Sequence, residues 1–231
     1  MSSVADNLAV IRGRIEAACE KAGRDSSRIQ LVGVTKTVPI ERIREGVNAG
    51  ISILGENYVQ EARKKKEILA DLPVAWHFIG HLQTNKAGIA VECCDCIETL
   101  DRENLALELN RKGEKAGKRI PVLIQINIGS EPTKSGIPPE RLFSFFNLAS
   151  NFEWLNIRGL MALPPFFDQP ERARPYFRQM RELLDRLRQE ASFPEKLTEL
   201  SMGMSGDFEV AIEEGATLVR IGTALFGQRP T

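Results

Sequence analysis

Short apolar runs alternate with longer amphipathic segments along almost the whole chain. In the first segment, apolar residues recur from Val4 to Ala22 at steps of three and four, which is the spacing of one helix face. Eight apolar runs follow and are predicted strands: residues 30–36, 50–56, 75–80, 96–100, 121–128, 157–163, 197–204 and 217–227. Helix-patterned segments separate them, including residues 40–50, 56–72, 102–117, 138–150, 173–191 and 207–216.

This alternation predicts the fold class. Strands that alternate with helices pair in parallel through right-handed crossovers. Eight such units in 231 residues predict an α/β protein with a single (β/α)8 TIM barrel, preceded by an extra N-terminal helix. A doubly wound open sheet is the alternative. No linker or low-complexity tract divides the chain, so residues 1–231 are predicted to form one domain. The longest irregular stretches, residues 129–139 and 164–172, directly follow strands, where a barrel carries its functional loops.

Composition narrows the function classes. The chain has 31 basic and 31 acidic side chains and a formal net charge of +0, so nothing attracts it to nucleic acid or to an anionic membrane. The basic run at residues 63–66 lies on a helical pattern and is predicted to be a solvated helix face. The N-terminus lacks the apolar core of a signal peptide, and no segment reaches 18 uninterrupted apolar residues. These features predict a cytoplasmic protein.

Four cysteines in a chain without an export signal are predicted to be free thiols. Cys93, Cys94 and Cys96 cluster as metal ligands do, but the chain's two histidines, His77 and His81, do not complete a zinc pattern. We therefore expect no metal, and we expect these cysteines to pack as small residues at the start of a strand.

Lys36 ends the first predicted strand. In a (β/α)8 barrel, the carboxyl ends of the strands surround the active-site mouth. One interpretation is a lysine at the rim, with its stem on apolar surface and its ammonium in water. The other is an amine nucleophile that forms an imine with a carbonyl compound.

Two segments near the C-terminus have the character of an anion site. Ser205 and Gly206 follow the seventh predicted strand at the start of a predicted helix, and Gly222 with Thr223 lies near the end of the eighth. Helix N-termini, hydroxyl groups and glycines suit a phosphate, and phosphate is often bound by these two loops in barrel enzymes. The alternatives are that Ser205 is an ordinary helix N-cap and that Gly222 serves packing.

Arg220 lies on the same strand face as Leu218 and Gly222, because strand side chains alternate. If that face points inward, a carboxylate or a planar, electron-rich group must meet the guanidinium, since burying it unpaired costs several kcal/mol. Closing a barrel makes its first and eighth strands neighbours, which brings Lys36 within about 10 Å of the predicted anion site. A ligand with an aldehyde at one side of a small ring and a phosphate at the other, such as pyridoxal 5′-phosphate (PLP), fits that gap.

The sequence resembles the YggS/PROSC family of PLP-binding proteins, also called pyridoxal phosphate homeostasis proteins. The resemblance covers essentially the whole chain. The matching motifs are VGVTK (32–36), GENYVQE (55–61), WHFIGHLQTNK (76–86), INIGSEPTKSG (126–136), RGLMALPP (158–165) and LSMGMSGDFEVAIEEGATLVRIGTALFG (200–227). Together and in this order they are highly specific, and they imply a barrel like the N-terminal domain of alanine racemases.

The resemblance also implies roles for individual residues. Lys36 would form the aldimine with PLP, and Arg220 would face the pyridine nitrogen. The remaining implied contacts are the phosphate ligands Ser205, Gly206, Gly222 and Thr223, the ring-edge residue Asn57, and the packing residues Met161 and Met202. His77 would serve structure by bonding a backbone carbonyl. Independently of the resemblance, Lys134 in the loop SEPTKSG is expected to cover the mouth or form a secondary imine, or else to act as a lid lysine bonded to Glu131.

Arg220 bears on what such a cofactor can do. A guanidinium stays protonated, so the ring nitrogen beside it does not take up a proton and the ring is a weak electron sink. The racemase-like alternative, a fold type III PLP enzyme with Lys36 as base, needs a second base, and the only tyrosines are Tyr58 and Tyr176. A phosphosugar enzyme with a Lys36 imine is a third hypothesis.

We therefore expect a protein with little or no turnover that holds PLP. The resemblance further implies a monomer that acts in vitamin B6 homeostasis and contacts apo PLP enzymes transiently.

Overall fold

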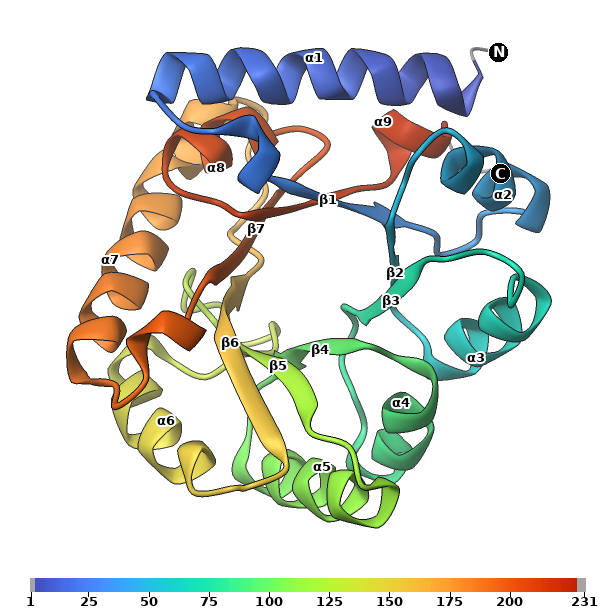
Figure 1. The fold of residues 1–231 in the computed structure, drawn as a ribbon. Helices are drawn as coiled ribbons and strands as arrows, with labels where there is room; N and C mark the ends of the chain where they lie inside the picture. Colours follow the sequence, from blue (N-terminus) through green and yellow to red (C-terminus); the bar gives the residue numbers. More distant parts are fainter. Residues whose placement is uncertain (1–2, 228–231) are drawn as a thin grey trace.

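The computed structural model describes residues 3–227, and its strands form one closed parallel barrel in sequence order, β1 to β8 (Figure 1). The strands are β1 (Gln30–Val34), β2 (Ile53–Glu56), β3 (Ala75–Phe78), β4 (Cys96–Leu100), β5 (Ile120–Ile126), β6 (Leu155–Ala162), β7 (Glu199–Met204) and β8 (Leu218–Ile221). The predicted (β/α)8 barrel is confirmed. The alternative of an open doubly wound sheet is wrong, because β1 pairs with β8, with Val32 opposite Arg220.

Helices surround the barrel (Figure 1). They are α1 (Val4–Ala22), α2 (Ile40–Asn48), α3 (Val59–Ile68), α4 (Ala87–Cys93), α5 (Glu103–Ala116), α6 (Leu142–Ser150), α7 (Arg174–Glu190), α8 (Phe208–Glu213) and α9 (Thr223–Phe226). One boundary corrects the sequence analysis. The eighth predicted strand, residues 217–227, ends at Ile221 and its second half forms the short helix α9.

The predicted extra N-terminal helix is α1, which lies across α8 and α9 (Figure 1). The Ser3 hydroxyl accepts a hydrogen bond from Asp6 N while the Asp6 carboxylate accepts one from Ser3 N, which satisfies two donors at the helix start. Gly23 ends the helix at φ 63°, a left-handed conformation that favours glycine. The buried stripe that includes Leu8 and Ile11 faces the barrel domain.

The core has two parts. Most buried apolar side chains form one continuous cluster between the strands and the helices. Two smaller clusters are separate from it: Val32, Ile53 and Leu218 form one, and Cys96, Leu123 and Met161 form the other. Because Val32, Leu218 and Leu123 alternate along their strands with residues of the large cluster, the small clusters fill the barrel interior.

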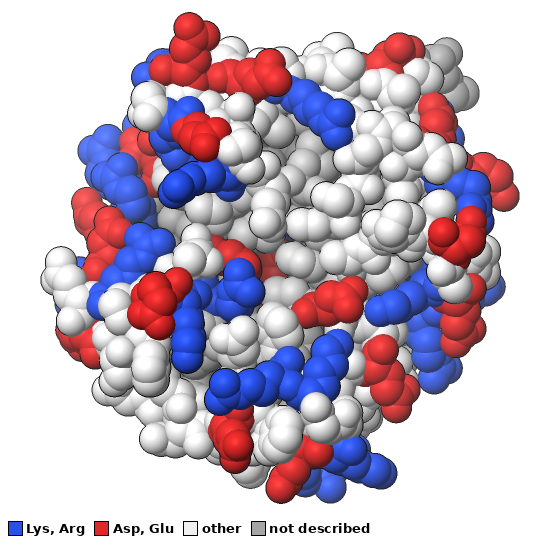
Figure 2. Space-filling view, viewed as in Figure 1, with Lys and Arg blue, Asp and Glu red and all other residues white. Residues whose placement is uncertain are grey.

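The four cysteines are buried free thiols, as predicted. Cys96 opens β4 as expected, whereas Cys93 belongs to the end of α4. Among residues 3–227, no group of three or more histidine, cysteine or acidic side chains has the arrangement of a metal site. Within the same residues, no helix combines the length and the apolar character needed to cross a membrane. The face shown in Figure 2 mixes basic and acidic side chains around a central hollow.

Candidate functional site

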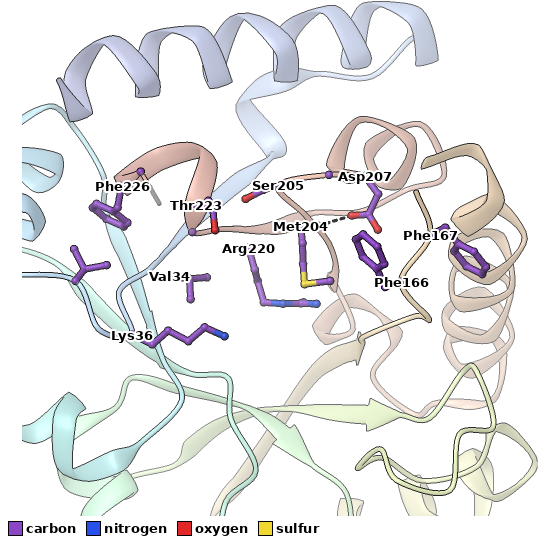
Figure 3. A pocket seen from close by; sticks show the side chains of 14 residues that line it. Val34, Lys36, Phe166, Phe167, Met204, Ser205, Asp207, Arg220, Thr223 and Phe226 are labelled. Atoms are coloured by element: carbon purple, nitrogen blue, oxygen red, sulfur yellow. Dashed lines mark hydrogen bonds between the residues drawn. The ribbon is translucent and has the colours of Figure 1, made fainter. Parts of the chain in front are cut away.

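A cavity of about 290 Å³ opens where β1, β7 and β8 end. It is lined by Lys36 and Val34 from the first strand and its turn, by Arg220, Gly222 and Thr223 from the eighth, and by a loop after the seventh. Figure 3 shows Lys36 extending toward the guanidinium of Arg220, with Ser205 and Thr223 on the far side of the cavity. The remaining lining residues are Val38, Phe166, Phe167, Met204, Gly206, Asp207, Phe226 and Gly227.

Lys36 stands in a constrained turn. Its predecessor Thr35 is held by a hydrogen bond from its amide to Gly55 O (3.0 Å) and by its hydroxyl, which donates to Glu56 Oε1 (2.6 Å). Its successor Thr37 has φ 61°, a left-handed conformation that β-branched residues rarely adopt. Such strain persists only where the surroundings over-determine it, and it concentrates at functional sites. The backbone on both sides of Lys36 is therefore fixed.

Lys65 contributes to this constraint, and it corrects the prediction that residues 63–66 form a solvated helix face. Lys65 is 8 % exposed, and its ammonium donates to Thr35 O at 2.7 Å. It also pairs with Glu56, which is fully buried, and more distantly with Glu61 (3.3 Å). The helical pattern did identify Arg63 and Lys64 as exposed.

Arg220 points into the barrel, as strand alternation predicted, and is 3 % exposed. Its Nη2 donates to Ala162 O (2.8 Å) and its Nη1 donates to Ser201 Oγ (2.5 Å). The Ser201 hydroxyl donates in turn to Glu98 Oε2 (2.5 Å), and Glu98 Oε1 lies 2.7 Å from His77 Nδ1. Glu98 is thus the carboxylate that the sequence analysis expected to meet the guanidinium of Arg220. His77 bonds this carboxylate, so its predicted backbone-carbonyl partner is wrong.

Electrostatics follow from this burial. Desolvation favours the neutral form of a buried ionisable side chain. It therefore lowers the pKa of Arg220, while the negative charges of Glu98 and Asp207 oppose that change. Burial alone would raise the pKa of Glu98, but the hydrogen bond and charge of His77, together with Arg220, outweigh burial and lower it. Glu98 is therefore an anion at neutral pH.

The loops after β7 and β8 meet at the other end of the cavity. Ser205 is not the N-cap of the following helix, because that position is held by Asp207. The Ser205 hydroxyl instead accepts a hydrogen bond from Ala224 N (3.4 Å), which joins the two loops. A Cβ added at Gly206 would meet no atom within 4 Å, so glycine leaves open space at this edge of the cavity. At Gly222 the same atom would lie 3.4 Å from Val34 Cβ.

Three predicted site residues do not line this cavity. Met202 is fully buried in the cluster between strands and helices, and Met204, two residues later on β7, lines the cavity instead. Met161 is fully buried in the barrel interior beside Leu123 and Cys96. Asn57 lines a neighbouring hollow, together with His81 and Lys86, and its buried Oδ1 has no hydrogen-bond partner among the described residues.

The loop after β5 crosses toward the loops after β3 and β6. Lys134 forms an ion pair with Glu131 (2.6 Å) and donates to Pro164 O (3.2 Å), which is the predicted lid-lysine arrangement. Ser135 Oγ lies 3.0 Å from His81 Nδ1. These contacts attach the loop on both sides of the barrel mouth.

Sequence reasoning missed two residues, Glu98 and Ser201, which complete the surroundings of Arg220. One signal was available for Glu98: an acid in the middle of CIETL, a predicted buried strand, needs a partner. Ser201 carried no comparable signal, because a buried serine is common. Phe166, which is 84 % exposed at the cavity edge, was also missed.

Known proteins resemble the chain over its whole length. The family described as alanine racemase, N-terminal domain, matches residues 7–230. The pyridoxal phosphate homeostasis protein of Aquifex aeolicus is 49 % identical, with 97 % of each chain covered. That of Vibrio cholerae is 43 % identical, with 99 % of this chain and 98 % of the relative covered.

Solved structures agree with these sequence relatives. PipY of Synechococcus elongatus, determined with PLP bound, is 37 % identical with a TM-score of 0.85 and covers 97 % of this chain and 100 % of its own. Alanine racemase of Corynebacterium glutamicum shares the fold at 15 % identity, with a TM-score of 0.68 over 97 % of this chain and 62 % of its own. The chain therefore belongs to the alanine racemase N-terminal domain family and, within it, to the pyridoxal phosphate homeostasis proteins.

Proposed function

We propose that this protein binds PLP covalently through Lys36 and thereby takes part in vitamin B6 homeostasis. One observation carries the proposal: a lysine amine, a buried guanidinium and the hydroxyls of Ser205 and Thr223 all face one cavity. The cavity volume of about 290 Å³ lies near the lower end of small-molecule sites, roughly 300–1,000 Å³. The names of the relatives and the PLP bound to PipY support the same ligand.

The residues fit the parts of PLP. Lys36 would hold the aldehyde carbon through a C=N bond, and Arg220 would donate to the pyridine nitrogen. Ser205, Gly206, Gly222 and Thr223 would receive the phosphate, and the open space beside the Gly206 Cα leaves room for it. Asn57, Met161 and Met202 stand outside the cavity lining, so we assign the ring contact on the β7 side to Met204.

The same residues favour holding the cofactor over turning substrate over. Bound PLP supplies an electron sink for carbanion chemistry, and a guanidinium at the ring nitrogen weakens that sink because it donates a hydrogen bond and keeps its proton. Racemisation needs a second base. Tyr58 is an exposed residue at the start of α3 that lines the neighbouring hollow, and Tyr176 stacks on Phe167 from α7. We therefore propose a monomeric, cytoplasmic reservoir that releases PLP to apo-enzymes.

Reduction with borohydride tests the covalent link. The purified protein, loaded with PLP, is reduced and digested, and mass spectrometry locates the modified lysine. We expect the adduct on Lys36, and we expect the near-visible absorbance to disappear in Lys36→Ala but to persist in Lys64→Ala, a control at an exposed lysine. A colourless protein, or an adduct that is unchanged in Lys36→Ala, would contradict the proposal.

Hydrogen exchange separates a reservoir from a racemase. The loaded protein is incubated with a panel of L-amino acids in deuterated water, and Cα deuteration is followed by NMR. We expect exchange no faster than with free PLP at the same concentration. Sustained exchange at many turnovers per minute would establish an amino-acid racemase or related enzyme instead.

A further inference from the structure

The hydrogen bonds around Arg220 form a directed chain that starts at His77. Glu98 is an anion, so the His77 Nδ1 must carry a proton and donate it to Glu98 Oε1, 2.7 Å away. Ser201 donates to the other oxygen of Glu98 and accepts from Arg220 Nη1. The four side chains come from β3, β4, β7 and β8, and each is at most 8 % exposed. Each hydrogen bond between these four side chains therefore has a defined donor and acceptor.

Charge balance inside the barrel depends on Glu98. Arg220 brings a positive charge where water cannot stabilise it, and Glu98 Oε2 lies 3.9 Å from Arg220 Nη1. The other charged groups that act on the pair are farther out. Asp207 lies at the cavity edge, and Glu199 is paired with Arg158 at 2.8 Å. Glu98 is thus the nearest counter-charge of Arg220.

Ser201 keeps these two charges apart. A carboxylate in direct contact with a guanidinium takes two of its N–H groups in a bidentate pair. Here the serine hydroxyl stands between them, so that Nη1 meets a neutral oxygen and Nη2 meets the carbonyl of Ala162. Both terminal nitrogens of the guanidinium are thereby held in place, while its charge is only partly offset.

We propose that Glu98 is a positioning residue for Arg220, acting through Ser201 and oriented by His77, and that its charge tunes the protonation of a ligand imine on Lys36. The ligand in this inference is the one in the proposed function, on which the inference therefore rests. The hydrogen bonds are those of the protein without ligand. Glu98 is not itself among the residues that line the cavity, and it reaches the lining through Ser201 and Arg220. Its effect on the ligand is therefore electrostatic and orientational.

The hydrogen bonds can be tested without any ligand. In the apo protein, 15N-edited NMR of the imidazoles should show His77 with its proton on Nδ1 and a strongly downfield N–H resonance, which Glu98→Gln removes or shifts upfield. Thr99→Val is the matched control, because Thr99 is the next residue on β4, is buried, and has a hydroxyl with no hydrogen-bond partner among the described residues. A His77 protonated only on Nε2 would overturn the proposed chain.

The charge effect is tested in the loaded protein by following the imine absorbance against pH. Removing the carboxylate disfavours the protonated, cationic imine, so Glu98→Gln should lower its apparent pKa by roughly 0.5–1 unit. Arg220→Met removes a positive charge and should raise it, while Thr99→Val should leave it unchanged. A merely structural role would shift both variants in the same direction, and that result, or no shift in Glu98→Gln, would overturn the proposal.

A third variant separates position from charge and remains informative if Glu98→Gln does not fold. Ser201→Ala keeps both charges and removes only the bridging hydroxyl. We expect PLP to dissociate several-fold more readily from this variant, with the imine pKa close to that of the unmodified protein. An unchanged affinity would refute the positioning role. If the unmodified protein forms no adduct at Lys36, the proposed function fails, while the NMR experiment still decides whether Glu98 orders this chain.

Discussion

Two buried cations in this protein have similar partners in different surroundings. Lys65 and Arg220 each meet a buried carboxylate, a hydroxyl-bearing residue and a backbone carbonyl. Lys65 contacts its carboxylate, Glu56, directly, and Thr35 provides both the carbonyl and the hydroxyl of that cluster. Arg220 is separated from Glu98 by Ser201 and lines a cavity.

The difference lies in what each cation has left to offer a ligand. An ammonium that donates to two carboxylates and a carbonyl has little left to offer a ligand, and Lys65 holds the turn that carries Lys36. A guanidinium has five N–H donors, and the described hydrogen bonds of Arg220 come from Nη1 and Nη2. On the function proposed above, the serine spacer leaves the second cation able to donate to a ligand.

The largest expected effect comes from removing the first cation. Lys65→Met leaves the fully buried Glu56 with only the Thr35 hydroxyl, and Glu56 Oε2 already has no hydrogen-bond partner among the described residues. Leaving a buried charge uncompensated costs about 3–5 kcal/mol. We expect the free energy of unfolding, measured by urea denaturation, to fall by that amount, whereas the exposed control Lys64→Met should change it by less than about 0.5 kcal/mol. A Lys65 variant as stable as the control would show that this ion pair is not structural.

Removing the second cation should cost less stability. In Arg220→Met, Glu98 still accepts hydrogen bonds from His77 and Ser201, so its carboxylate keeps two donors. We expect the free energy of unfolding of the apo protein to fall by about 1–3 kcal/mol, the cost of leaving buried polar groups partly unsatisfied. The comparison between the two cations fails if this loss in urea denaturation equals or exceeds that of Lys65→Met.

The sequence predicted the direction of Arg220 because strand alternation is a local property. Its partner was not predictable in the same way, since Glu98 and Ser201 are 103 residues apart and meet only when the barrel closes. For Lys65 the difficulty is different. Four consecutive basic residues present every side of a helix, and a lysine stem is apolar enough to lie on either face. The nearby acid Glu56, nine residues earlier, belongs to a strand, so helix spacing did not reveal the pair.

The methionines show a second limit. Met202 was expected at the ring from the family motif, and it faces the outer core, while Met204 lines the cavity. The register between β7 and β8 shifts between Ser201 and Met204. An irregularity of this kind changes which residues face inward, and period-two alternation cannot place it. The fold was predictable from periodicity, but the details of the lining depended on such local departures.

Asp207 gives the smallest expected effect and sharpens the comparison, because this carboxylate has no cation in direct contact among the described residues. Burial raises its pKa, although the Met204 amide and the charge of Arg220 oppose this. A carboxyl whose folded pKa is raised contributes its full stability below its unfolded pKa, near 3.8, and that contribution is lost as pH rises through the folded pKa. Asp207→Asn, which keeps an oxygen for Met204 N, should therefore be more stable at pH 7 by roughly 0.5–1 kcal/mol.

The pH dependence of that gain distinguishes charge from packing. Well below pH 3.8, Asp207 is neutral in both the folded and the unfolded state, so the advantage of Asp207→Asn in urea denaturation should vanish there. Glu98→Gln should behave in the opposite sense, because the folded pKa of Glu98 is lowered: its cost appears at neutral pH and shrinks as the pH falls through that lowered pKa. The exposed control Asp168→Asn should show neither trend. If Asp207→Asn were equally stabilising at pH 3 and pH 7, the effect would come from packing. The charge of Asp207 would then not destabilise the folded protein, and the contrast with Glu98, whose charge is stabilised by its neighbours, would fail.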